Sequence, residues 1–213
     1  FSIVSTLNVS QLNNPSYLEA EEAEKIFYPI HQPSPRLGEF NENPSMNVVL
    51  IILESFSAEY MGCMNGGKES FTPFLDSIAA KSLVFDGMAN GKRSIESIPS
   101  FIAGLPSVMS DAYITCPYSQ NNINTLPSIL KKHGYYSAFF HGGYNGSMGF
   151  DKFCEHAGYD NYYGMNEYGD LVDYDGKWGI FDEPFLQFMG KQMNTFPQPF
   201  HATVFTISSH HPY

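Results

Sequence analysis

Basic residues are scarce in this chain. Among 213 residues, 11 are Lys or Arg and 22 are Asp or Glu, so the formal net charge is −11. An acidic chain lacks the basic surface that displaces counterions from nucleic acid, and we expect no nucleic-acid partner. The charge balance does not argue against a phosphorylated substrate, because a bound divalent cation reverses the local sign of charge.

Long hydrophobic runs are also missing. The longest, Val48 to Leu53, is far shorter than the roughly 20 residues that a membrane-spanning helix needs. The chain opens at Phe1-Ser2, with no initiator methionine and no signal-peptide pattern. We therefore expect a piece of a longer protein.

Cysteine is rare and widely spaced. Cys63, Cys116 and Cys154 form no Cys-x-x-Cys pair and no spacing typical of zinc ligands. Three cysteines allow at most one internal disulfide. Cysteine usage therefore does not decide the cellular compartment.

Apolar residues, in contrast, are plentiful. They make up 43% of the chain, and aromatic residues make up 15%. This composition supports one large domain or part of one. Residues 1–45 are predicted to be a lead-in segment, with a short helix between Ser16 and Phe27 and a proline-rich stretch after it. Residues 46–213 are predicted to form the domain.

Strand and helix patterns alternate within residues 46–213. Val48 to Leu53 is a continuous apolar run, which predicts a strand buried on both faces. The alternation indicates an α/β fold, a mainly parallel central sheet with helices on both faces. The further predicted strands are 82–85, 135–140 and 201–207. Helices are predicted to begin at Thr72-Pro73, with an apolar pattern that reaches Leu83, and at Thr125-Leu126-Pro127 and Glu183-Pro184.

Polar clusters follow the predicted strands. They are Glu54-Ser55, the loop 87–93, His141-Gly142-Gly143 and the segment 208–212 (Ser-Ser-His-His-Pro). Because the carboxyl ends of parallel strands meet at one edge of a sheet, we expect these clusters to form a site there.

Glu54 and the serine that follows the loop 87–93, Ser94, each have two interpretations. Glu54 directly follows six apolar residues, so its carboxylate either coordinates a cation or caps the following helix. Ser94 is predicted to begin a helix, where backbone N–H groups stabilise an oxyanion. A serine there is either a nucleophile or a plain N-cap.

The residues alone also leave the roles of the histidines undecided. His141 either lines a pocket, where Gly142-Gly143 would let backbone approach a ligand, or is a turn residue. Of the adjacent pair His210 and His211, at most one is expected to face a given site. The other histidines have no supporting context.

Five segments in this order resemble the alkaline phosphatase/sulfatase superfamily, from about Asn47 to Tyr213. The closest branch is the lipoteichoic acid synthase-like phosphoglycerol transferases and the phosphoethanolamine transferases. The segments that carry the resemblance are NVVLIILESF, TPFLDSIAAKSLVFDGMANG, TLPSILKKHGYYSAFFHGG, WGIFDEPF and TISSHHPY.

The resemblance offers two positions for the nucleophile. Ser94 to Pro99 is similar to the Thr-x-x-Ser-x-Pro segment of the phosphoethanolamine transferases, which places the nucleophile at Ser94. Ser97 fits the sulfatase pattern (Cys/Ser)-x-Pro-x-Arg except that Phe101 replaces the Arg. We expect Ser94 to be the nucleophile.

The resemblance implies a metal-dependent phosphotransferase. Glu54 and Ser94 would bind a divalent cation (Mn²⁺, Mg²⁺ or Zn²⁺), and His141 and His210 would bind substrate phosphate. A phosphoglycerol or phosphoethanolamine headgroup would pass from a phospholipid through phospho-Ser94 to a cell-envelope glycan or lipid, outside the cytoplasmic membrane. The alternatives are a sulfatase or phosphodiesterase hydrolase, and a non-catalytic binding domain of the same fold.

Two family features are missing. The family's further metal ligands, an Asp-His pair, lie downstream of the His-x-Pro segment, so residues 46–213 would be the N-terminal part of a catalytic domain and inactive alone. The Trp and Arg that hold glycerol phosphate in the synthases have no counterpart in Asn145 to Asp151.

Overall fold

The computed structural model describes residues 16–28, 46–88 and 91–211. The chain divides into two units, residues 1–46 and 47–213. The first unit contains α2 (Ala20–Ile26), which lies within the predicted helix and has no buried residue. Its first turn carries Glu21 and Glu22 and its last turn Lys25, the arrangement that the helix dipole favours.

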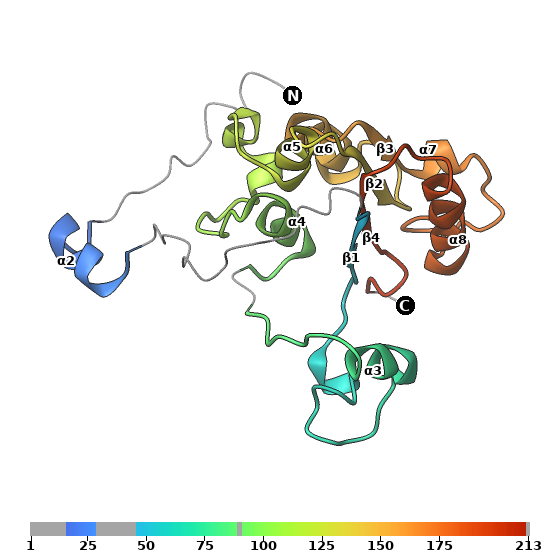
Figure 1. The fold of residues 1–213 in the computed structure, drawn as a ribbon, viewed down its shortest axis with the longest axis horizontal. Helices are drawn as coiled ribbons and strands as arrows, with labels where there is room; N and C mark the ends of the chain where they lie inside the picture. Colours follow the sequence, from blue (N-terminus) through green and yellow to red (C-terminus); the bar gives the residue numbers. More distant parts are fainter. Residues whose placement is uncertain (1–15, 29–45, 89–90, 212–213) are drawn as a thin grey trace. The chain divides into compact units, whose positions relative to one another are not determined.

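The second unit alternates strands and helices (Figure 1). None of the helices in the described ranges is long and apolar enough to span a bilayer. Its elements are β1 (Val48–Ile52), η2 (Ala58–Tyr60), α3 (Pro73–Ala79), α4 (Ser94–Ala103), η3 (Tyr113–Thr115), η4 (Pro117–Gln120), α5 (Leu126–Lys131), β2 (Tyr136–His141), η5 (Ser147–Gly149), α6 (Phe150–Ala157), β3 (Asn161–Tyr163), α7 (Met165–Tyr168), α8 (Asp182–Met193) and β4 (Phe200–Phe205).

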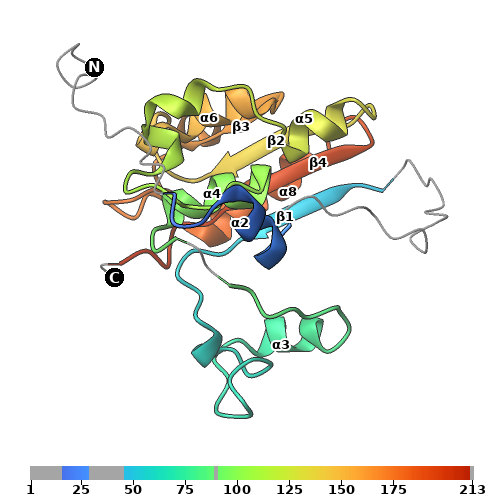
Figure 2. The ribbon, with the colours of Figure 1, turned by 90° about the vertical axis from the view of Figure 1, so that its left-hand side faces the viewer.

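The four strands form one sheet in the order β1-β4-β2-β3, and every pairing is parallel. Ile52 of β1 and His141 of β2 both lie opposite Phe205 of β4. The carboxyl ends of these three strands are therefore level at one edge of the sheet, as Figure 2 shows for the strands drawn in cyan, red and yellow.

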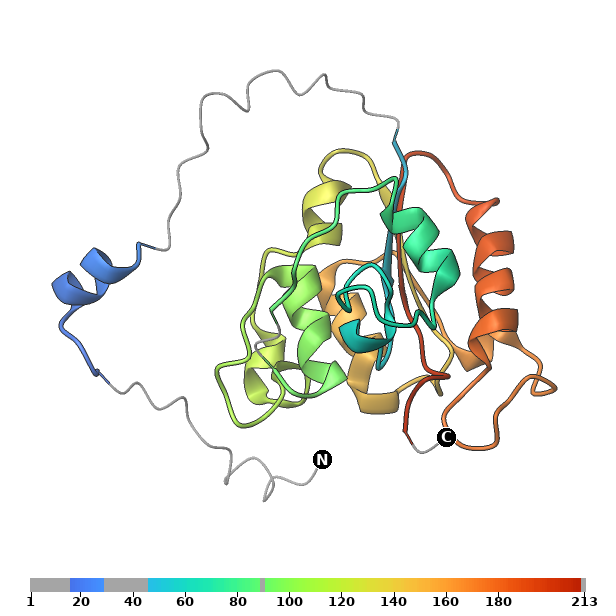
Figure 3. The ribbon, with the colours of Figure 1, turned by 90° about the horizontal axis from the view of Figure 1, so that it is seen from below.

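Two hydrophobic cores lie on opposite faces of the sheet. Phe139 and Phe205 contribute to the core that includes residues of α4 and α6. Their strand neighbours Phe140 and Val204 contribute to the core that includes residues of α8. Successive strand residues alternate between faces, so helices cover both sides of the sheet (Figure 3). The predicted fold class is confirmed.

Three expectations fail in detail. β1 is an edge strand, and its Val49 and Ile51 side chains are 44% and 56% exposed, so it is not buried on both faces. Residues 82–85 form no strand, because this short run lies outside the sheet, where Leu83 is 86% exposed. The helix that begins at Pro73 ends at Ala79, before Leu83.

The pattern also missed two adjacent elements. α6 is only eight residues long and carries four charged or ionisable side chains, yet Phe150 and Phe153 are buried. β3 has only three residues. Segments this short give little periodic signal.

Candidate active site

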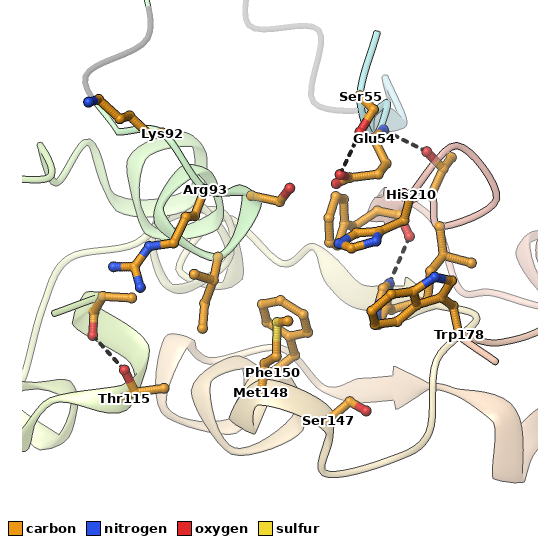
Figure 4. Close-up of a pocket in the computed structure, with 17 residues that line it drawn as sticks. Glu54, Ser55, Lys92, Arg93, Thr115, Ser147, Met148, Phe150, Trp178 and His210 are labelled. Atoms are coloured by element: carbon orange, nitrogen blue, oxygen red, sulfur yellow. Dashed lines mark hydrogen bonds between the residues drawn. The ribbon is translucent and has the colours of Figure 1, made fainter. Parts of the chain in front are cut away.

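A cavity of about 710 Å³ lies at the carboxyl edge of the sheet (Figure 4). The four residues expected from the sequence, Glu54, Ser94, His141 and His210, all line it. They come from the ends of three neighbouring strands and the start of α4. The complete lining is Glu54, Ser55, Lys92, Arg93, Ser94, Ile95, Ala112, Thr115, His141, Ser147, Met148, Phe150, Trp178, Phe205, Thr206, Ile207 and His210.

Glu54 is fixed by the neighbouring strand and by its own turn. Its backbone N–H donates to the Thr206 hydroxyl at 2.8 Å, and its Oε1 accepts a bond from the Ser55 hydroxyl at 2.9 Å. Ser55 has a left-handed backbone conformation, with φ of 55°, which is unusual for a residue other than glycine. The residue after β1 thus bends the chain sharply and orients the carboxylate.

The second carboxylate oxygen of Glu54 is the atom that points to a metal ligand. Glu54 is only 6% exposed, and its Oε2 has no hydrogen-bond partner among the described residues. An unpaired carboxylate oxygen out of water is costly unless a cation binds it. Oxygen ligands of this kind suit Mg²⁺ or Mn²⁺. The Glu54 carboxylate is therefore suited to the role of a metal ligand.

Ser94 is the first residue of α4, and Glu96 fixes the turn before it. The Glu96 carboxylate accepts the backbone N–H groups of Lys92 at 2.8 Å and Arg93 at 3.0 Å. It also binds the Arg93 guanidinium at 2.8 Å. These bonds hold the pKa of Glu96 at about 2, chiefly through Arg93. The turn that presents Ser94 is therefore held by a carboxylate that stays ionised.

Ser97 is placed differently, one helical turn further along α4. Its hydroxyl donates to the Ser94 carbonyl oxygen at 2.6 Å, and Ser97 does not line the cavity. Of the two candidate serines, only Ser94 is presented to Glu54 and the histidines.

His141 ends β2 and is 4% exposed. Its Nδ1 lies 3.0 Å from the Phe205 carbonyl oxygen, which can only accept, so this nitrogen carries the proton. Burial lowers the pKa of His141, so the ring is neutral at neutral pH and Nε2 keeps its lone pair. A side chain on Gly143 would place its Cβ 2.9 Å from Nε2, so glycine leaves this nitrogen room.

His210 lies in the loop after β4. Asp182 holds that loop, because its carboxylate accepts the backbone N–H groups of Ile207 at 2.8 Å and Ser208 at 3.0 Å. The His210 ring packs against Trp178, with ring centroids 4.2 Å apart. His211 is exposed and does not line the cavity, so one histidine of the pair faces the site.

Sequence reasoning missed Thr206, Met148 and Trp178 as lining residues. Trp178 belongs to the WGIFDEPF segment, whose position in the resemblance was the available signal. Met148 places a thioether in the cavity lining.

The metal-ligand set is partial. Within the described ranges, no group of three or more His, Cys, Asp and Glu side chains could hold a metal ion. Glu54 and Ser94 suit a cation in chemical type, but they supply only part of a coordination shell.

Comparisons with known proteins find relatives of similar sequence. The lipoteichoic acid synthase-like protein YvgJ of Bacillus subtilis is 27% identical over 183 residues, covering 84% of this chain and 29% of its own length. Lipoteichoic acid synthase 1 of the same bacterium is 30% identical over 193 residues, covering 86% of this chain and 29% of its own length. The chain thus spans less than a third of these curated relatives.

Solved structures show the same fold. An alkaline phosphatase superfamily protein from Vibrio parahaemolyticus matches with a TM-score of 0.69 and 29% identity, over 79% of this chain and 42% of that one. The lipoteichoic acid synthase LtaP of Listeria monocytogenes matches with a TM-score of 0.63 and 24% identity, over the same shares. These matches confirm the resemblance and show that the chain covers part of such a domain.

The sequence pattern of the sulfatase family matches residues 46–213, which is nearly all of the chain after the lead-in segment. The chain belongs to the sulfatase family, within the alkaline phosphatase superfamily.

Proposed function

We propose that the chain is the N-terminal part of a phosphotransferase domain. It transfers a phosphorylated headgroup, of phosphoglycerol or phosphoethanolamine type, from a phospholipid through a covalent phospho-seryl intermediate on Ser94. The observation that carries the proposal is the single cavity where Ser94, the unpaired oxygen of Glu54 and two histidines meet.

Both chemical steps take place at the hydroxyl oxygen of Ser94. Its hydroxyl oxygen attacks the phosphorus of the phosphodiester, the bond from phosphorus to the diacylglycerol oxygen breaks, and that oxygen takes up a proton. An acceptor hydroxyl then attacks the phosphorus of phospho-Ser94, and the serine oxygen leaves and regains a proton. Ser94 begins α4, so the free N–H groups of the first turn stabilise negative charge on the phosphoryl oxygens.

The histidines take different roles in this scheme. His141 is neutral and its Nε2 is an acceptor, so it receives the proton from the attacking hydroxyl. His210, in the loop that Asp182 holds, contacts a phosphate oxygen. The sequence alone grouped both histidines as phosphate ligands, and the Nδ1 bond of His141 is the reason for separating them.

Glu54 and Ser94 would hold a divalent cation, Mn²⁺, Mg²⁺ or Zn²⁺. When bound, such a cation lowers the pKa of a coordinated hydroxyl and makes it a better nucleophile. The 213-residue chain alone is expected to be catalytically silent, since Glu54 and Ser94 alone bind such a cation weakly.

The relatives named as lipoteichoic acid synthases support the substrate class and its location. The donor would be a phospholipid and the acceptor a cell-envelope glycan or lipid. Residues 46–213 would act outside the cytoplasmic membrane, and residues 1–45 would connect them to a membrane anchor upstream.

The test is an assay of the longer protein that contains this chain. Vesicles carrying headgroup-labelled phosphatidylglycerol or phosphatidylethanolamine are incubated with Mn²⁺, Mg²⁺ or Zn²⁺, and an aryl sulfate is assayed in parallel. We expect diacylglycerol release from vesicles that depends on Ser94 and on the cation. Hydrolysis of the sulfate ester without diacylglycerol release would establish the hydrolase alternative. No turnover of any substrate would indicate a binding domain.

A further inference from the structure

Trp178 is the single tryptophan of the chain, and it lines the cavity beside His210 (Figure 4). Its indole nitrogen Nε1 is buried and has no hydrogen-bond partner among the described residues. A buried N–H donor without an acceptor costs about 1–3 kcal/mol. This cost is removed when an acceptor oxygen binds next to the ring.

The tryptophan is held firmly, so the unpaired donor does not reflect a loose side chain. The Asp175 carboxylate accepts the backbone N–H groups of Lys177 and Trp178, both at 2.7 Å. Gly179 follows and lies against the end of β2, where a Cβ would be 2.4 Å from the Gly142 oxygen. The Ile180 N–H then donates to the same oxygen at 2.9 Å.

The charges of the cavity favour an oxygen-rich ligand over a cationic one. Glu54 is the one acidic residue in the cavity lining, and its carboxylate is assigned to a cation in the proposed function. Lys92 and Arg93 are the basic residues, and Arg93 is engaged by Glu96. Ser147, Met148 and Phe150 form another part of the cavity lining and carry no charge. Trp178 supplies a donor from a different segment.

We propose that Trp178 contacts the substrate directly, with its indole N–H donating to an oxygen of the bound phosphorylated headgroup while its ring keeps His210 in place. This inference rests on the proposed function. The acceptor is either a phosphate oxygen or a headgroup hydroxyl. The ammonium end of phosphoethanolamine has only donors and makes no such bond.

The indole N–H can be observed directly. In the ¹⁵N-labelled 213-residue chain, one tryptophan gives one indole cross-peak, which is titrated with sn-glycerol 1-phosphate, O-phosphoethanolamine and inorganic phosphate in the presence of Mg²⁺. We expect a saturable downfield shift of the indole proton with sn-glycerol 1-phosphate. The same shift with all three probes assigns the acceptor to the phosphate, and a shift with the glycerol compound alone assigns it to a hydroxyl.

Calorimetry with three variants separates the contribution of the indole N–H to binding affinity from the contribution of the aromatic ring. Trp178→Phe keeps an aromatic ring next to His210 but removes the N–H, and we expect about 10-fold weaker binding of sn-glycerol 1-phosphate. Trp178→Ala removes both and should bind more weakly still. Lys191→Gln, which removes a charge on the exposed side of α8 and outside the cavity lining, should bind like the unchanged chain.

The outcomes distinguish this inference from the function on which it rests. Unchanged affinity in Trp178→Phe, or binding by calorimetry without a shift of the indole peak, overturns the role of Trp178 and leaves the proposed function standing. Failure of the longer protein that contains this chain to bind any of the three probes overturns the proposed function, and this inference with it.

Discussion

The two ends of the sheet both bury polar side chains, but they use them differently. At the carboxyl end, Glu54 and Trp178 each keep a buried polar atom without a partner, and both line the cavity. At the amino end, His201 on β4 also has an unpartnered nitrogen, Nδ1, but it is 0% exposed and packs against Tyr159.

An unsatisfied polar atom therefore marks a candidate site only where it borders a cavity. His201 interacts with Thr203, whose hydroxyl lies 2.7 Å from the Tyr159 oxygen, and this group is enclosed by the core. Nothing can reach it without unfolding. At the carboxyl end, Glu54 and Trp178 line a cavity that has room for a ligand. Substitutions at the two ends should separate into effects on activity and effects on stability.

The largest expected effect is that of Glu54→Gln. It removes a charged cation ligand while keeping the shape of the side chain, and in the longer protein we expect turnover to fall about 10³-fold or more. Thermal unfolding should change little.

The matched control at the amino end is Tyr159→Phe, which removes the hydroxyl bonded to Thr203. It should lower the free energy of unfolding by about 1 kcal/mol and leave turnover unchanged. If Glu54→Gln keeps more than about a tenth of the activity, the two ends do not differ as argued.

A smaller effect is expected for Asp182→Asn. The amide replaces a charged acceptor that holds two backbone N–H groups of the His210 loop. We expect the free energy of unfolding in urea to fall by about 2 kcal/mol. Turnover should fall about 10-fold, because the loop that carries His210 is no longer held in position. Glu183→Gln makes the same charge change on the next, exposed residue and should leave both quantities unchanged. Equal effects of the two substitutions would contradict the role assigned to Asp182.

The smallest effect concerns pH and the amino end alone. Burial lowers the pKa of His201 to about 4, whereas an unfolded histidine titrates near its ordinary value. The unfolded state binds the proton more readily between these values, so stability is lost as the pH falls through this window.

Between about pH 7 and about pH 5.5, His201 should account for a loss of about 1 kcal/mol in the free energy of unfolding. Urea unfolding of the chain and of His201→Gln at both pH values measures this contribution. The substitution should reduce the pH dependence, and identical pH dependence in both proteins would show that His201 titrates normally.

The sequence predicted that these residues gather at one edge of the sheet because this clustering depends on strand ends. Apolar runs that stop at Glu54 and His141 mark the carboxyl edge without any knowledge of tertiary contacts. It could not predict contacts between segments far apart in the chain. Asp182 holds residues 207 and 208 through hydrogen bonds across 25 and 26 positions, and no local pattern encodes these bonds.

The failed strand has a different cause. Residues 83–85 are apolar, but a strand also needs a neighbour in the sheet, and this run pairs with none of the four strands in the described part of the chain. Composition gives no information about which segment takes that place. The same limit explains why the exposed face of Val49 and Ile51 could not be foreseen.

The most direct test of the central claim is to locate the covalent intermediate. The longer protein is mixed with a phospholipid donor, quenched in acid and digested, and the phosphoryl adduct is mapped by mass spectrometry. We predict an adduct on Ser94 that is absent from Ser94→Ala and still present in Ser97→Ala. An adduct on Ser97, or a formylglycine at that position, would contradict the assignment of Ser94 as the nucleophile.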